Sequence, residues 1–295
     1  MAFKTVLSVT ETYHSDQDVI TAATLCAEIG ARLSVLIIGF ATRPAFGGGT
    51  GVAAPQRIEV HAVDTVRLEK HCREIEAISQ DMIRLERRSE ELETLLGAMR
   101  LSCDVDSAYC DLASVDEVVR KRALCADLTI IGPSLLENNI LGSRVINGSL
   151  FESGKPVLVV PKGADATLSP RRVLVGWDSR VEASRAVREA LDLLSGAKEV
   201  RVTLVDPETT HNGNGAEPGA DIGDYLALHG VQVVVDRLQS GGQSVASVLT
   251  QHAIDASADM IVMGAYSHRR LHERLFGGVR RWILEKPPMP LFLAR

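Results

Sequence analysis

Groups that could bind a phosphorylated ligand stand at corresponding places in the second half of the sequence. One apolar run ends in Gly176-Trp-Asp178, which supplies a carboxylate directly after an apparent strand. Another ends in Met263-Gly264, and a basic loop (268–274) then leads to Gly277-Gly278 at the start of an apparent helix. Glycines let backbone N–H groups approach an anion, and a helix N-terminus adds a positive dipole. The pattern indicates a site for an anionic ligand.

The elements that must position these groups alternate between short strands and amphipathic helices. Short apolar runs separated by amphipathic segments indicate a parallel sheet with helices on both faces. With a strand order of 3-2-1-4-5, the order reverses between strands one and four, where open parallel sheets bind ligands. Asp178 and Gly264 would then face each other across one cleft. We expect strands at 172–177, 200–205, 231–237, 259–264 and 290–294, and helices at 181–195, 219–229, 243–256 and 278–286.

The first half repeats this pattern in a longer form. Cys125–Gly132 resembles Ser257–Gly264, since each has an Ala-Asp pair, a short apolar strand and a glycine. Such self-similarity indicates a duplicated domain. We therefore predict an α/β protein of two doubly wound domains, at 1–162 and 170–295. Each would have a five-stranded parallel sheet ordered 3-2-1-4-5 with helices on both faces.

The additional length of the first half lies near 58–99. Glu and Arg fill most of this segment, while a set of apolar residues keeps a helical spacing. We expect an elongated second helix packed on its own sheet with ends that project into water, and a partner-docking surface is the alternative. The apolar set is Ile75, Ile78, Met82, Leu85, Leu92, Leu96 and Met99.

The motifs of the second half resemble those of the universal stress protein domain. Leu174-Val-Gly-Trp-Asp178 and Met263-Gly264-x2-Ser267-x9-Gly277-Gly278 are similar to the Asp after strand one and the Gly-x2-Gly-x9-Gly-Ser/Thr of its ATP-binding members. The resemblance covers both halves and is strongest over about 172–295. It implies ATP or AMP in the C-terminal domain only, with Mg²⁺ able to accompany ATP. The implied nucleotide-binding residues are Gly176, Asp178, Leu204, Met263, Gly264, Ser267, Gly277, Gly278 and Val279.

Within that resemblance, adenine would lie near Asp178, the ribose and α-phosphate over Gly264, and the outer phosphates against Gly277 and Gly278. Two positions depart from the motif, because Ser267 stands where the second glycine should be and Gly278 stands where Ser/Thr should be. A side chain at 267 would crowd a turn that favours glycine. A pocket whose glycines only shape turns is therefore the alternative.

The first half departs further from the motif. Thr10 is interpreted as the counterpart of Asp178, and Pro133 removes one N–H donor directly after the strand-four glycine. The nearest candidate phosphate cup is Gly142-Ser143. We expect this half not to hold ATP in the family's manner.

Composition argues against several classes of function. The net charge is −6, so a nucleic acid partner is not expected, because phosphate neutralisation requires a concentrated basic surface. No apolar run approaches the ~20 residues of a membrane helix, and the N-terminus shows no signal pattern, which predicts no membrane insertion and a cytoplasmic location. Five cysteines without a Cys-x2-Cys pattern favour neither a disulfide framework nor a metal site.

The resemblance implies a non-enzymatic regulatory protein of the stress response. Its two domains would pair internally through their last strands, at 157–160 and 291–294, covering two exposed edges. Protein partners are expected, and a homodimer is an open alternative. Because no Walker lysine, nucleophile elbow or positioned general base is present, no catalytic residue is predicted. The competing hypotheses are a protein-only scaffold that uses the 58–99 helix and, less favoured, a slow ATP hydrolase.

Overall fold

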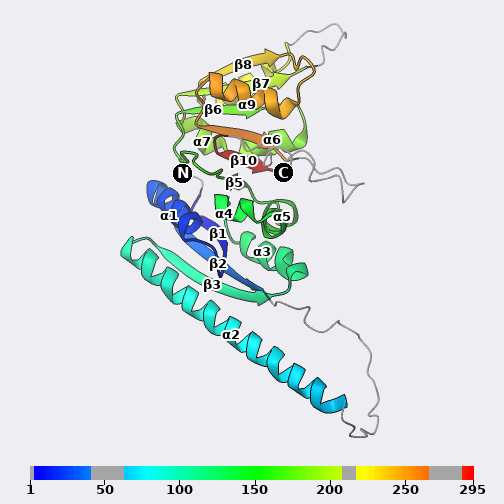
Figure 1. Ribbon diagram of the computed structural model, residues 1–295. Coiled ribbons are helices and arrows are strands. Elements are labelled where there is room, and N and C mark those ends of the chain that lie inside the picture. Colours follow the sequence, from blue (N-terminus) through cyan, green and yellow to red (C-terminus); the bar gives the residue numbers. More distant parts are fainter. Residues whose placement is uncertain (1–2, 41–62, 208–216, 266–287) are drawn as a thin grey trace.

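The computed structural model describes residues 3–40, 63–207, 217–265 and 288–295, without the side chains of 63–74 and 139. This part of the chain forms one ten-stranded sheet, ordered β3-β2-β1-β4-β5-β10-β9-β6-β7-β8 (Figure 1). Each half contributes five strands in the predicted order 3-2-1-4-5, and within each half all pairs are parallel. The predicted fold class is confirmed, while the domain boundaries 1–162 and 170–295 stay a prediction.

The first half builds its sheet around an almost wholly apolar strand, β2. That strand pairs with β1 and β3 on either side, so its near-continuous burial is what a central parallel strand requires. Helix α1 ends at Gly30, whose left-handed φ of 68° suits glycine at a helix end. The elements are β1 (Thr5–Glu11), α1 (Gln17–Ile29), β2 (Arg32–Phe40), α2 (Val63–Ala98), β3 (Cys103–Cys110), α3 (Val115–Ala123), β4 (Leu128–Ile131), α4 (Pro133–Glu137), α5 (Asn139–Ile146), a π-helix (Asn147–Glu152) and β5 (Val157–Val159).

The second half follows the predicted elements closely. The helix expected at 181–195 is divided into two at Ala190, and the helix expected at 278–286 lies outside the described residues. Ser244 begins α9, because its hydroxyl accepts the N–H of Ser247 at 3.1 Å. The elements are β6 (Arg172–Gly176), α6 (Val181–Glu189), α7 (Leu191–Gly196), β7 (Glu199–Val205), α8 (Ala220–Leu228), β8 (Val233–Leu238), α9 (Val245–Asp255), β9 (Met260–Gly264) and β10 (Leu291–Ala294).

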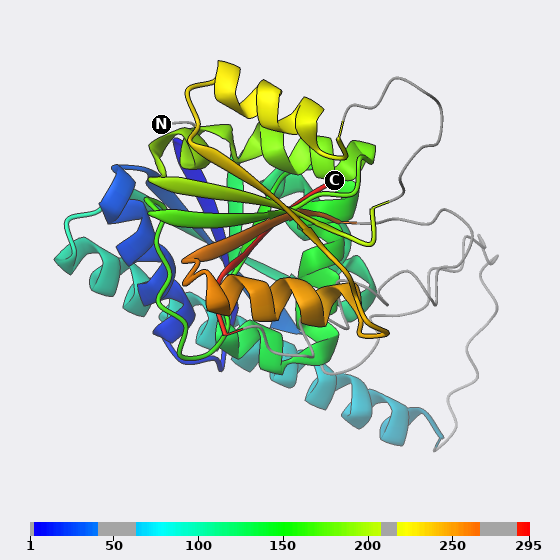
Figure 2. The same cartoon turned by 90° about the horizontal axis from the view of Figure 1, so that it is seen from above.

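Helices cover both faces of the sheet and separate the core into two layers. Buried residues of α1, α2, α6, α7 and α8 share one apolar cluster, and those of α3, α4, α5 and α9 share the other. Figure 2 shows α8 (yellow) and α9 (orange) on opposite faces of the second five strands. On each face of the sheet, helices of the first half and of the second half therefore share one apolar layer.

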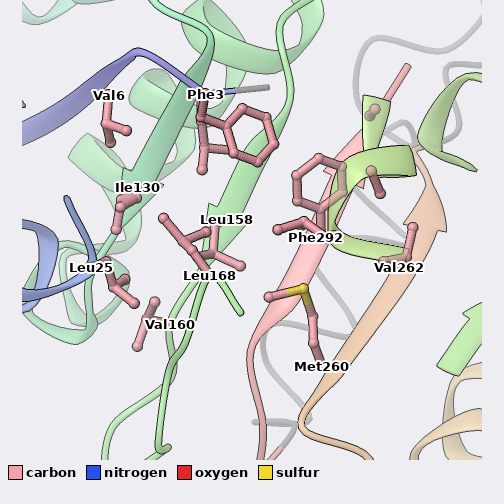
Figure 3. Close-up of a cluster of buried hydrophobic side chains, with 14 of the residues drawn as sticks. Phe3, Val6, Leu25, Ile130, Leu158, Val160, Leu168, Met260, Val262 and Phe292 are labelled. Carbon is pink, nitrogen blue, oxygen red and sulfur yellow. The ribbon is translucent and has the colours of Figure 1, made fainter. Parts of the chain in front are cut away.

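The two halves meet through an antiparallel pair of strands, β5 and β10. Phe292 is opposite Leu158 in this pair, which is the pairing expected at 157–160 and 291–294. The rings of Phe3 and Phe292 lie 6.1 Å apart across the junction (Figure 3). Arg295 adds a polar contact, since its Nη1 donates to the carbonyl oxygen of Phe151 at 2.7 Å. The junction is thus a buried part of the core.

Helix α2 is much longer than the sheet on which it packs. At 1.5 Å per residue its 36 residues span ~54 Å, whereas the eight residues of β3 span ~27 Å. Leu85, Leu92 and Leu96 are buried against the sheet, while Ile75 and Met82 are exposed. The N-terminal part of α2 extends beyond the carboxyl ends of the first-half strands (Figure 1). The expected elongated, projecting helix is confirmed.

Candidate functional site

The edge at which the cleft was predicted is the one where β6 and β9 are neighbours and the strand order of the second half reverses. Gly176 on β6 is opposite Met263 on β9, so Asp178 and Gly264 follow on adjacent strands at the same edge. The topology thus places the carboxylate beside the glycine-ended strand, as the sequence predicted. This edge is where open parallel sheets bind ligands.

Asp178 is held in a tight turn between β6 and α6. Its Oδ1 accepts the N–H of Arg180 at 3.1 Å, and Ser179 between them has a left-handed φ of 60°. Burial raises the pKa of Asp178 above its usual value, and the Arg180 N–H and guanidinium oppose that rise. With 36% of the side chain exposed, the carboxylate can still accept hydrogen bonds from a ligand.

Gly264 ends β9 against the first turn of α6. A Cβ at this position would lie 2.5 Å from the backbone N of Ala183 and from the backbone C of Glu182. The glycine is therefore required for helix-to-strand packing, whatever else it does. Gly176 on β6 is less crowded, because its nearest neighbour would be the Leu249 side chain at 3.1 Å.

Two further side chains near this edge, Leu204 and Trp177, pack into the same apolar cluster on one face of the sheet. Leu204 on β7 is 4% exposed and packs closely on Gly219, which begins α8 with a φ of 85°. Trp177 lies between Gly176 and Asp178, and its indole Nε1 is buried with no hydrogen-bond partner among the described residues. Buried donors are normally paired. Trp177 was missed from the sequence, although its place beside Asp178 was a usable signal.

The first half has a different arrangement at the equivalent edge. Val6 on β1 is opposite Leu128 on β4, and Val173 on β6 is opposite Met260 on β9, so Val6 and Val173 hold equivalent positions. Counting forward equally from both, the residue that corresponds to Asp178 is Glu11, not Thr10. The interpretation of Thr10 as the counterpart was wrong by one residue. In a strand, a shift of one residue moves the side chain to the other face of the sheet.

Glu11 is already engaged by neighbouring side chains. The Nδ2 of Asn138 donates to Glu11 Oε2 at 3.1 Å, and His14 Nε2 lies 3.1 Å from the same oxygen. The carboxylate that corresponds to Asp178 is therefore occupied by the protein itself.

An internal carboxylate also occupies the anion position of the first half. Asp18 is 1% exposed, and its two oxygens accept the N–H groups of Ser134 and Leu135 at 3.0 and 2.9 Å. A Cβ at Gly132 would lie 2.3 Å from Asp18 Cγ, so glycine at the end of β4 admits this side chain. A phosphate would have to displace a buried carboxylate here.

Gly142 is not part of a phosphate cup. It lies within α5, which begins at Asn139, and a Cβ there would be 2.5 Å from the carbonyl oxygen of Leu135. The glycine lets α5 approach α4 closely. Sequence spacing misplaced the helix start, which is set by Asn138 accepting the N–H of Leu141 at 3.1 Å.

A groove of about 690 Å³ lies away from the predicted cleft, in the first half. It runs between α1, α4 and the segment 160–166 that leaves β5. Hydroxyl groups line it, including Ser15 and Ser134, whose oxygens are 3.3 Å apart. None of the predicted site residues lies in this groove.

Comparisons with known proteins decide the family of the second half. Residues 170–295 match the model of the universal stress protein family. The C-terminal half is a universal stress protein domain. No curated protein matches the chain.

Solved structures extend the resemblance in fold to the first half. A universal stress protein from Archaeoglobus fulgidus superposes with a TM-score of 0.62 at 16% identity, over 98% of this chain and 96% of that chain. A protein from Pseudomonas aeruginosa described as a universal stress protein gives 0.52 at 13% identity, over 99% and 93%. Both halves therefore share the fold found in universal stress proteins.

The remaining predicted positions of the universal stress protein domain, Ser267, Gly277, Gly278 and Val279, lie outside the described residues. Across the described ranges, no three His, Cys, Asp or Glu side chains gather as ligands of a metal ion would. Nor does any helix there have the length and apolarity needed to cross a membrane. Of the predicted site residues, the structure thus describes Gly176, Asp178, Leu204, Met263 and Gly264.

Proposed function

We propose that this chain is a tandem universal stress protein whose C-terminal domain binds an adenine nucleotide, ATP or AMP, and that it acts as a non-enzymatic regulator. The observation that carries the proposal is the meeting of Asp178 and Gly264 at the reversal of strand order. A half-exposed carboxylate suits the exocyclic amine of adenine, which is a hydrogen-bond donor. Next to it in the sequence, Trp177 has a buried indole Nε1 that donates to no described residue.

The contrast between the halves supports a single nucleotide site. In the first half Glu11 and Asp18 are both engaged inside the protein, whereas Asp178 is bonded only through its own turn among the contacts of the described residues. A nucleotide would therefore compete with an internal carboxylate in the first half, and no described residue of the second half shows the same arrangement. Mg²⁺, where ATP is the ligand, would be held largely by the phosphates.

Isothermal titration with ATP and with AMP tests this proposal on the full chain. We expect Asp178→Ala to weaken binding by about tenfold or more, since a lost charge-assisted hydrogen bond costs ~1.5–3 kcal/mol. Glu11→Ala is the matched control and should leave the titration unchanged. Equal heats for the native chain and Asp178→Ala would refute the site, and loss of binding in Glu11→Ala alone would move it to the first half.

Phosphate release in the same samples separates a regulator from a slow ATP hydrolase. We expect no release above a protein-free blank. Release that disappears in Asp178→Ala would instead assign the hydrolase activity to this domain.

A further inference from the structure

Strand β8 ends the described sheet with its outer edge open. It pairs with β7 and with no other described strand, whereas α2 lies along β3 at the opposite end of the sheet (Figure 1). An open edge presents a row of backbone N–H and C=O groups that can pair with another strand. The edge of β8 is therefore the part of the sheet that remains available for a partner.

The hydrogen bonds of β8 show which of its residues face outward. The carbonyl oxygens of Gln232 and Leu238 accept N–H groups from β7 and from the residue that follows it, both at 2.9 Å. Because successive residues of a strand turn their backbone groups to opposite sides, Val233, Val235 and Arg237 point theirs away from β7. No described residue bonds to these outward groups.

From this geometry we infer that the outer edge of β8 is a dimer surface, and that its occupant is the β8 strand of a second copy of this chain, paired antiparallel about Val234. A row of outward N–H and C=O groups is complemented by another extended strand. The chain already joins its own two halves in this manner, through the antiparallel pair of β5 and β10. The proposal stands independently of nucleotide binding.

The side chains of β8 favour this register. Val234 is 42% exposed, and it would lie opposite the same residue of the second copy, so that an exposed apolar side chain covers another. Val233 and Val235 would lie opposite one another in two hydrogen-bonded pairs, which form about four hydrogen bonds. A register centred on Asp236 or on Arg237 would instead set like charges opposite each other, which is unfavourable.

The charged side chains of β8 are already compensated within the chain. Asp236 Oδ2 lies 3.0 Å from Arg201 Nη1 and 2.9 Å from His252 Nε2. Arg237 pairs with Glu217 at 3.0 Å. Charged side chains on an edge strand are one device that keeps sheets from pairing edge to edge. Because both charges of β8 have partners in their own chain, they oppose a second strand less than free charges would.

Sedimentation of the full chain tests the proposal with a matched pair of variants. Val234→Lys would set two lysines opposite each other in the pair, and Ile254→Lys places the same charge on α9, where Ile254 is 46% exposed. At micromolar concentration we expect the native chain and Ile254→Lys to have twice the 31.9 kDa monomer mass. Val234→Lys should raise the dimer dissociation constant by about tenfold or more. A native chain that sediments as a monomer, or a dimer indifferent to Val234→Lys, would overturn the proposal.

Amide hydrogen exchange of the native chain locates the contact without any substitution. On dilution from dimer to monomer, the N–H groups of Val233 and Val235 should exchange faster, because they lose their hydrogen bonds to the second copy. The N–H of Asp236, which points to β7, should exchange at the same rate in both states. Slow exchange at Val233 and Val235 that dilution does not change would assign the edge to another occupant. Fast exchange in both states would place the dimer contact elsewhere, and either result would overturn the pairing of β8 with itself.

Discussion

Substitution of Asp18 measures how much this buried carboxylate, which fills the anion position of the first half, adds to the free energy of unfolding. Asp18→Ala leaves the N–H groups of Ser134 and Leu135 without their acceptor. A buried donor left unpaired costs about 1–3 kcal/mol. Because Leu135 is buried and Ser134 is partly buried, we expect a loss of ~3 kcal/mol in the free energy of unfolding. Asp18→Asn should lose less, about 1–2 kcal/mol, since the amide oxygen can still accept one of the two N–H groups.

Urea unfolding followed by circular dichroism measures this loss as the shift in midpoint multiplied by the slope m. The control is Glu137→Ala, a nearby carboxylate whose 3.1 Å pair with Lys162 is 65% and 81% exposed. That substitution should change stability by no more than ~0.5 kcal/mol. If Asp18→Ala unfolds at the same urea concentration as Glu137→Ala, the Asp18 carboxylate does not hold the start of α4. The conclusion that an internal carboxylate fills the anion position of the first half would then be wrong.

Further predictions concern pH, thiol reactivity and the junction of the halves. Burial raises the pKa of Asp178, so its ionised form weakens the fold as pH rises above 3.8. A hydrogen bond from Ser240 lowers the pKa of Asp206, so its ionised form strengthens the fold above pH 3.8. Thermal unfolding at pH 7 should therefore show Asp178→Asn melting higher and Asp206→Asn melting lower than the native chain. The Asp178 difference should fade as the pH falls to 3.8, and the Asp206 difference should fade only as the pH falls below 3.8; shifts of the same sign would contradict this. Burial raises the pKa of the Cys26 thiol to about 12, so iodoacetamide at pH 8 should label exposed Cys125 and leave Cys26 unmodified, as read by mass spectrometry; equal labelling would show that α1 opens. Phe292→Ala should destabilise the fold by about 3–5 kcal/mol in urea, because it empties a fully buried ring site; a loss below 1 kcal/mol would mean that the junction is loosely packed.

The sequence predicted the architecture well because the signals were periodic. Alternating apolar strands and amphipathic helices determined the ten strands, and the reversal of strand order then brought Asp178 beside Gly264. The long helix was also predicted, but its seven-residue spacing does not reveal where the sheet beneath it ends. Ile78 and Leu85 look alike in the sequence, yet one is exposed and the other is buried.

The first-half site was harder to predict because it depends on register and on pairing across the chain. A displacement of one residue moved the assignment from Glu11 to Thr10. Asp18 sits on the buried face of α1, and its partners are 116 and 117 residues away, so no local pattern points to them. Gly142 was read as a ligand contact, whereas it is a packing contact.

Antiparallel pairing of β5 with β10 reverses the strand direction where the two halves meet. The other strand pairs of the described sheet are parallel, so this is the single reversal of strand direction among the described strands. A change in this one pair, such as the loss of the Phe292 ring, would therefore disturb the sheet of both halves at once.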